Sequence, residues 1–133
     1  LLYPAAYKAS RELPDEALPY ILMTGRILYH YNAFSMTSRS PGLMEIEGEG
    51  YIELNRKDAD KLGIDNGDQV EVKSRRGSIV TKARVGSKVS PGETWMPFHF
   101  PDSHVNVLTN AALDDYARIP TYIVCAVNIG KAD

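Results

Sequence analysis

Residues 65–85 read DNGDQVEVKSRRGSIVTKARV, and hydrophobic and polar side chains alternate through most of this stretch. Val70 and Val72 lie on one side of the first strand that the alternation predicts, because successive side chains of a strand point to opposite faces. A second alternating run follows the connection Ser-Arg-Arg-Gly at residues 74–77. The pattern predicts a β-hairpin in which Gly77 takes a positive φ at the turn.

Short strand-like segments lie on both sides of this hairpin, and turn-forming residues separate them. The predicted strands outside the hairpin are residues 20–24, 51–54, 94–100 and 122–129. Six to seven short strands with one or two short helices make the chain mainly β. We expect a small closed barrel, because closure removes the exposed edges of a sheet.

One helix is predicted over residues 56–62, and both of its ends are defined by sequence. Asn55 is a suitable N-cap, and Asp58 stands three residues later, in the position of a capping-box acid. Gly63 suits the left-handed conformation that often ends a helix, and Ile64 follows as an apolar residue that can pack back against it.

The other connecting segments are predicted to be irregular. Residues 25–50 contain a Ser-Pro-Gly turn at 40–42 and an acidic, glycine-containing loop at 45–50. Residues 101–121 form a long connection, with one helical turn expected near residues 110–113. Loops of this length in a compact domain are usually functional or disordered.

The composition is that of one globular domain of 133 residues, 44% of them apolar. We expect residues 1–18 to be a linker from upstream domains of a longer polypeptide, and residues 19–133 to be the barrel domain.

A net charge of −2 gives no overall attraction for nucleic acid, and no apolar run is long enough to cross a bilayer. The single Cys125 excludes an intramolecular disulfide and is expected to be an inert, buried residue.

The end of the first predicted strand carries groups suited to an anionic ligand. Thr24, Gly25 and Arg26 offer a hydroxyl group, closely approachable backbone N–H groups and a bidentate cation. The alternative is that Gly25 only permits a bend and that Arg26 is solvated. Arg75 and Arg76 are similarly open to two interpretations, a basic patch or a solvated hairpin turn.

Further polar groups follow the strand predicted at residues 94–100. Phe98 and His99 lead into the long connection, which supplies the amide side chains of Asn106 and Asn110. Amides can recognise the edge of a heterocycle through a paired donor and acceptor. Polar groups at several strand ends are what a binding cleft at one end of a barrel requires, although core packing is the alternative for the phenylalanine.

Neither a metal site nor a catalytic site is predicted within this chain. The soft ligands His30, His99, His104 and Cys125 do not have the spacing of a zinc site. No paired carboxylates, Ser/His/Asp set or general base can be identified, so the chemistry of these residues is that of binding.

Together these segments resemble the C-terminal molybdopterin-dinucleotide-binding domain of molybdenum or tungsten oxidoreductases that carry two pterin guanine dinucleotides. Among these enzymes, the chain most closely resembles the catalytic subunits of formate dehydrogenases. The resemblance covers about residues 19–129, in order and with similar spacing. It rests on residues 24–33 (TGRILYHYNA), 35–37 (SMT), 39–43 (RSPGL), 51–55 (YIELN), 58–59 (DA), 62–64 (LGI), 74–78 (SRRGS), 96–100 (MPFHF), 106–114 (NVLTNAALD) and 125–127 (CAV).

The resemblance implies a double-psi β-barrel that contacts one pterin dinucleotide. The cofactor-binding residues that it implies are Thr24, Gly25, Arg26, Leu28, His30, Tyr31, Asn32, Ser35, Thr37, Phe98 and Asn106. Ile123 stands where relatives often carry a lysine, so one charged contact to the cofactor is absent or replaced.

The same resemblance implies a cofactor that this chain only partly surrounds, the bis-molybdopterin guanine dinucleotide with molybdenum or tungsten. A 4Fe-4S cluster and the catalytic residues would lie upstream in the longer subunit. That subunit would oxidise formate to carbon dioxide, whereas the isolated domain would be inactive. The implied partners are the upstream domains and electron-transfer subunits, with no nucleic acid and no membrane insertion. A cytoplasmic location is expected, with the periplasm as the alternative.

Two other functions stay open from sequence alone. Within the same class, the domain could belong to a nitrate reductase, which Met-Pro-Phe-His-Phe at residues 96–100 modestly disfavours. In a different class, a free-standing barrel could bind proteins or nucleic acids. The net negative charge and the lack of interleaved aromatic and basic residues argue against the latter.

Overall fold

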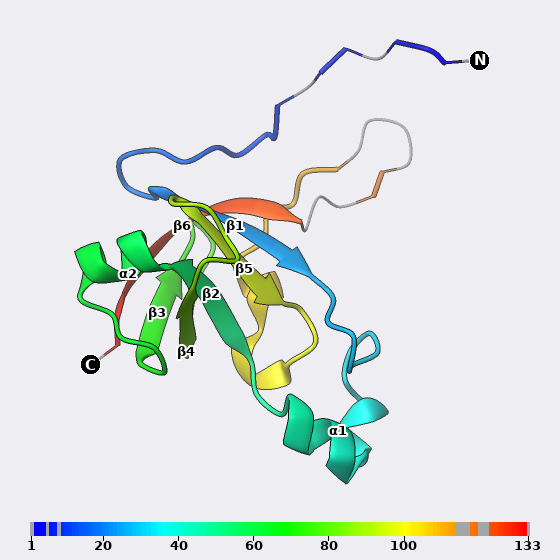
Figure 1. Cartoon of the computed structure of the whole chain (residues 1–133). Helices are drawn as coiled ribbons and strands as arrows, with labels where there is room; N and C mark the ends of the chain where they lie inside the picture. Colours follow the sequence, from blue (N-terminus) through cyan, green and yellow to red (C-terminus); the bar gives the residue numbers. More distant parts are fainter. Residues whose placement is uncertain (1, 5, 8, 114–117, 120–122, 133) are drawn as a thin grey trace.

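Six strands close into a barrel in the computed structural model, which describes residues 2–4, 6–7, 9–113, 118–119 and 123–132 (Figure 1). The strands are β1 (Tyr20–Gly25), β2 (Tyr51–Asn55), β3 (Gln69–Lys73), β4 (Ser78–Gly86), β5 (Glu93–Pro97) and β6 (Val124–Lys131). Their order around the barrel is β1-β5-β2-β4-β3-β6. The mainly-β closed barrel that the sequence predicted is therefore confirmed.

The topology has an internal two-fold relationship. β1 pairs with β5 in parallel and β2 pairs with β4 in parallel, while the other four pairings are antiparallel. Exchanging β1, β2 and β3 for β4, β5 and β6 maps the strand order and these orientations onto themselves. The barrel is thus built from two interleaved three-strand halves, although the sequence shows no repeat.

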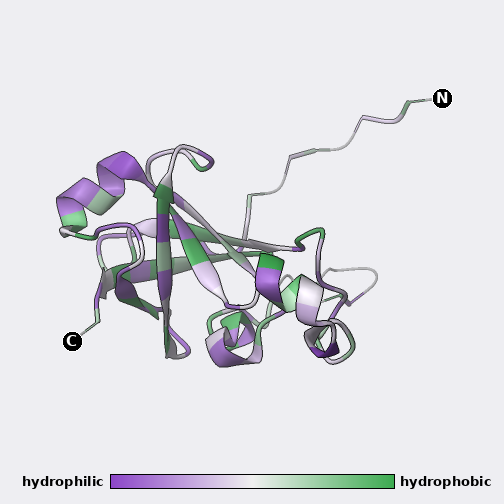
Figure 2. Cartoon of the chain, turned by 60° about the horizontal axis from the view of Figure 1, so that its bottom comes forward, coloured by the Kyte–Doolittle hydropathy of each residue, from purple (hydrophilic) through white to green (hydrophobic). Residues whose placement is uncertain are grey.

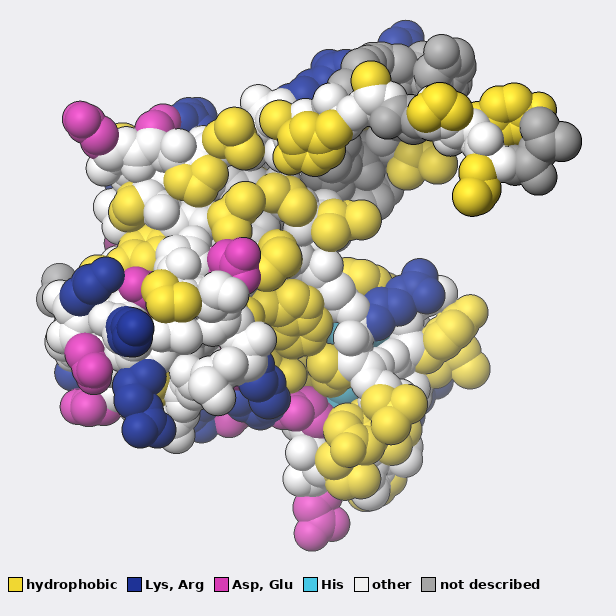
Figure 3. Space-filling view, turned by 45° about the horizontal axis from the view of Figure 1, so that its top comes forward, with side chains coloured by type: hydrophobic (Ala, Val, Ile, Leu, Met, Phe, Trp, Pro, Cys, Tyr) yellow, Lys and Arg dark blue, Asp and Glu magenta, His cyan; other side chains and the backbone are white. Residues whose placement is uncertain are grey.

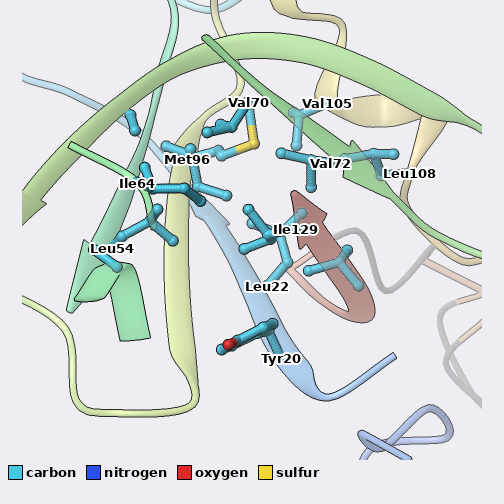
Figure 4. Packing of buried hydrophobic residues seen from close by; sticks show 14 of the residues in the cluster. Tyr20, Leu22, Leu54, Ile64, Val70, Val72, Met96, Val105, Leu108 and Ile129 are labelled. Atoms are coloured by element: carbon cyan, nitrogen blue, oxygen red, sulfur yellow. The ribbon is translucent and has the colours of Figure 1, made fainter. Parts of the chain in front are cut away.

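The barrel interior is filled by side chains from every strand. In β3, the buried Val70 and Val72 alternate with exposed neighbours, as the hairpin pattern predicted. Leu22 from β1, Leu54 from β2 and Met96 from β5 point toward them inside the barrel (Figure 4). Each Å² of apolar surface that is buried stabilises the fold by about 25 cal/mol, so this cluster is the main source of stability.

Helix α2 (Arg56–Leu62) has the bounds that the sequence predicted. The Asn55 side chain accepts a hydrogen bond from the Lys57 N–H at 3.0 Å, and Gly63 has a φ of 66°. The capping-box role predicted for Asp58 is wrong. Its buried carboxylate instead accepts a hydrogen bond from the Gly92 N–H at 2.6 Å, which ties the helix to the turn before β5. The outer face of α2 is polar, as Figure 2 shows.

Residues 26–50, which we call the arm, are more regular than predicted and protrude from one end of the barrel (Figure 1). They contain the 3-10 turn η1 (Thr37–Arg39) and helix α1 (Pro41–Ile46). The turn predicted at residues 40–42 is wrong, because Ser40 is an N-cap and Pro41 is the first helical residue. Proline is favoured there, since an N–H at that position would have no partner in the helix.

Three further expectations are corrected by the structure. β5 ends at Pro97, so residues 98–100 lie beyond the sheet. The helical turns of the long connection are η2 (Pro101–Ser103) and η3 (Val105–Val107), not residues 110–113. Gly77 does not have a positive φ. It is needed for a close approach, since a Cβ atom there would lie 2.7 Å from Val107 Cγ1.

The last strand is also shifted from its predicted bounds, since β6 begins at Val124 and extends to Lys131. Tyr122, the residue at which we expected it to begin, lies outside the described residues.

Part of the segment before β1 is tied to the barrel by ion pairs. Glu12 accepts hydrogen bonds from the Arg76 guanidinium at 2.8 and 3.0 Å, and from the Ala126 N–H at 2.9 Å. Asp15 pairs with Arg75. The two arginines of the hairpin loop therefore form ion pairs, which contradicts the open basic patch considered from sequence, and both residues remain exposed at the turn.

Candidate cofactor-binding site

A cavity of about 490 Å³ lies where β1 ends. Its lining residues are Thr24, Gly25, Arg26, Phe98, Asn106 and Ile123. They come from three segments that are far apart in the sequence. The parallel pairing of β1 with β5 accounts for the meeting of the first two segments, because its register places Gly25 beside Pro97. The volume is within the range of sites for small organic ligands.

Gly25 is required by close packing rather than by an unusual φ. A Cβ atom at this position would lie 2.8 Å from the Trp95 indole nitrogen, closer than Cβ atoms come to their neighbours, so the indole would have to move. The Phe98 N–H also donates to the Gly25 carbonyl at 3.1 Å. The backbone at the end of β1 is therefore held by the residues around the end of β5. Because Gly25 has no side chain, its backbone is left open to the cavity.

Arg26 gives the cavity a positive charge. Its side chain is exposed, and its guanidinium lies 5.7 Å from the centre of the Phe98 ring, within the range of a cation–π interaction. Asn106, also exposed, adds an amide that can both donate and accept. A cation, an amide, a threonine hydroxyl and an aromatic ring around one cavity suit a ligand that combines an anionic group with a heterocycle.

The other residues predicted at the site lie along the arm and do not line this cavity. Leu28 and Tyr31 are exposed, as are Asn32 and Ser35. Asn32 has a φ of 43°, and its carbonyl group faces His99. The arm thus presents apolar side chains to solvent at one end of the barrel, and Figure 3 shows hydrophobic groups on it.

His30 is buried inside the base of the arm and does not line the cavity. Its Nε2 atom donates to the Glu47 carbonyl oxygen, and its Nδ1 atom is hydrogen-bonded to the Thr37 hydroxyl group at 3.0 Å. The ring packs edge-on against Phe34 and Phe100, with centroid separations of 4.6 and 5.4 Å. Both ring nitrogens and both sides of the ring are therefore engaged by the protein, and so is the hydroxyl group of Thr37.

Glu47, near the C-terminal end of the arm, makes a second contact with the barrel. Glu47 binds Arg84 through both carboxylate oxygens, and the Arg84 guanidinium lies 3.4 Å from the centre of the Tyr51 ring. Arg84 lies on β4 and Tyr51 on β2. The arm is thus held at both of its ends, by the sheet at Glu47 and by the residues after β5 at Ile27 and Asn32.

His99 is a residue whose position the sequence did not reveal. It is buried, and its imidazole contacts the backbone of the arm at Ile27 and at Asn32. In the sequence it is only one of several polar residues near the end of a predicted strand. Its partners lie 72 and 67 residues away, so local patterns carry no information about them.

Cys125 is fully buried in β6, and burial raises the pKa of its thiol from 9.0 to about 11, with the carboxylate of Glu12 adding to the shift. We therefore expect iodoacetamide to leave the folded chain unmodified near neutral pH and to alkylate it after unfolding. Because the folded pKa is raised, the thiol's contribution to stability is complete below pH 9.0 and is lost as the pH rises through about 11. Rapid alkylation without unfolding would contradict this expectation.

Among the described residues, no group of three or more His, Cys, Asp or Glu side chains is arranged to hold a metal ion. In the same part of the chain, no helix has the length and apolar character needed to span a membrane.

Comparison with known proteins assigns the chain to a family. Residues 20–126 match the family described as Molydopterin dinucleotide binding domain. The F420-dependent formate dehydrogenase subunit alpha of Methanocaldococcus jannaschii is 48% identical over 130 residues, which is 98% of this chain and 19% of the relative. The nitrate reductase of Symbiobacterium thermophilum is 40% identical over 136 residues, covering 99% of this chain and 18% of the relative.

Among solved structures, the acetylene hydratase of Pelobacter acetylenicus superposes with a TM-score of 0.76 at 17% identity. The match covers 94% of this chain and 21% of that enzyme. The predicted double-psi β-barrel is confirmed. In these relatives the matching segment is one part of a much longer polypeptide, and this chain spans about a fifth of its length.

Proposed function

Because the chain belongs to the Molydopterin dinucleotide binding domain family, we propose that it grips one pterin guanine dinucleotide of a molybdenum or tungsten formate dehydrogenase. The longer subunit would oxidise formate to carbon dioxide. This domain would bind the cofactor, while the metal–pterin centre, when bound, supplies the redox chemistry. Upstream domains would carry the 4Fe-4S cluster and the catalytic residues, and electron-transfer subunits would accept the electrons. We place the enzyme in the cytoplasm, with the periplasm as the alternative.

The observation that carries the proposal is the convergence of Arg26, Asn106 and the end of β1 on one cavity. A pyrophosphate needs positive charge and N–H donors, which Arg26 and the backbone around Gly25 can provide. A guanine or pterin edge needs paired donors and acceptors, which Asn106 can provide. The residues present therefore fit the dinucleotide part of the cofactor, and the rest of the cofactor would contact other domains.

Formate is the favoured substrate of the whole enzyme because the formate dehydrogenase relative is 48% identical, against 40% for the nitrate reductase. The nitrate reductase relative makes nitrate reduction the second candidate. Assays of formate oxidation and nitrate reduction on the purified longer subunit distinguish the two, since only one activity should be present.

The proposal is tested by replacing Asn106 with alanine in the longer subunit. We expect the content of metal, and of guanosine monophosphate released by hydrolysis, to fall about threefold to tenfold through loss of hydrogen bonds worth about 0.5–1.5 kcal/mol each. Gln69, an exposed polar residue on β3, provides a matched control as Gln69→Ala, which should keep its cofactor. Equal cofactor content in both variants and in the unsubstituted protein would argue against the role of Asn106.

A further inference from the structure

The backbone that follows β1 is held by hydrogen bonds from the residues that follow β5. His99 contributes two of these bonds. The Ile27 N–H donates to His99 Nε2 at 3.1 Å, and His99 Nδ1 lies 2.6 Å from the Asn32 carbonyl oxygen. A third bond, from the Phe98 N–H to the Gly25 carbonyl, lies next to them. We call the two imidazole bonds the His99 clamp.

The two partners of the clamp fix the protonation state of the ring. A backbone N–H can only donate, so Nε2 must carry a lone pair. A carbonyl can only accept, so Nδ1 must carry the proton. The clamp therefore requires a neutral imidazole with its proton on Nδ1, because an imidazolium has no acceptor to offer Ile27.

The clamp spans the part of the arm that leaves the candidate cavity. Arg26 lies between Gly25 and Ile27, both of which are bonded to residues 98 and 99. Asn32 lies at the other end of the span and has a φ of 43°. Residues other than glycine adopt this left-handed backbone conformation uncommonly, and it needs support from its surroundings. His99 is 2% exposed, so the imidazole itself is shielded from water.

We infer that His99 is a positioning residue, whose neutral imidazole fixes the path of residues 26–32 and so presents Arg26 to the dinucleotide. This inference rests on the proposed function. His99 does not line the cavity with Arg26 and acts on the ligand only through the backbone of the arm. The consequence is that cofactor retention depends on the hydrogen-bonding pattern of the ring, not only on its bulk.

Three substitutions separate hydrogen bonding from packing. His99→Phe keeps an aromatic ring of similar size beside Phe98, whose ring centroid lies 4.7 Å from that of His99, but it removes both bonds. In His99→Gln, the amide lies near the place of Nε2 and can accept from Ile27. In His99→Asn, the amide lies near the place of Nδ1 and can donate to Asn32. The exposed His104, changed to Gln, is the matched control.

The first readout is hydrogen exchange at the Ile27 amide in this chain. It reports on the clamp whether or not any cofactor is bound. We expect exchange to rise about tenfold in His99→Phe, since one hydrogen bond is lost, and to rise much less in His99→Gln. Unchanged exchange in His99→Phe would overturn the clamp.

The second readout is the content of metal and of released guanosine monophosphate in the longer subunit. We expect the metal and nucleotide content to be about tenfold lower in His99→Phe than in the unsubstituted subunit. The content in His99→Gln should be close to that of the unsubstituted subunit, and the content in the His104→Gln control should be unchanged. Full retention in His99→Phe, or a better retention in His99→Phe than in His99→Gln, would overturn the positioning role. If the unsubstituted subunit held no cofactor, the proposed function itself would fail, while the exchange result would still report on the clamp.

Discussion

Replacing Arg26 with alanine in the longer subunit is expected to lower its content of metal and guanine nucleotide about 10- to 100-fold. Hydrogen bonds to charged groups contribute about 1.5–3 kcal/mol, and Arg26 is the only Arg or Lys among the described residues that line the cavity. The stability of the barrel should change little, because Arg26 is exposed and its contact with Phe98 is worth about 0.5–1 kcal/mol.

The matched control is Arg56→Ala, which removes the same charge from an exposed position on α2. It should leave both metal and nucleotide content unchanged. Metal analysis and nucleotide release, measured on both variants at equal protein concentration, check the prediction. Loss of cofactor from both variants alike would point to a general effect of charge and not to a contact made by Arg26.

Replacing Leu22 with alanine is expected to lower the free energy of unfolding of this chain by about 2–5 kcal/mol. Leu22 is completely buried in β1 and points into the barrel interior, so the substitution removes apolar contacts and leaves a cavity (Figure 4). Because the same strand ends at Thr24 and Gly25, cofactor retention should fall together with stability.

Leu28→Ala provides a control that makes the same chemical change at a side chain that is 90% exposed. It should cost less than about 0.5 kcal/mol. Denaturant unfolding of the two variants, followed by circular dichroism, measures the difference. Similar losses of stability in both would contradict the packing of β1 described above.

The elements that could be predicted from sequence are those with local determinants. The bounds of α2 follow from Asn55 and Gly63, which act on backbone groups within the helix ends. The hairpin follows from the alternation around Val70 and Val72. Helix α1 was missed because Ser-Pro-Gly is compatible with a turn and also with the N-cap and first residue of a helix.

The contacts that could not be predicted join distant parts of the chain. Asp58 bonds to Gly92, 34 residues away, so its capping-box position was misleading. The buried environment of His30 depends on Phe100 and Glu47, which come together only when the arm folds back to β2. The approach of Asn106 to Arg26 in turn requires the closed barrel.

The most direct test is to determine an experimental structure of the longer subunit with its cofactor bound. We expect the pyrophosphate of one dinucleotide to lie within hydrogen-bond distance of the Arg26 guanidinium, and a heterocycle edge to face Asn106. A dinucleotide that is fully bound by other domains, with no contact to the cavity at the end of β1, would contradict this account.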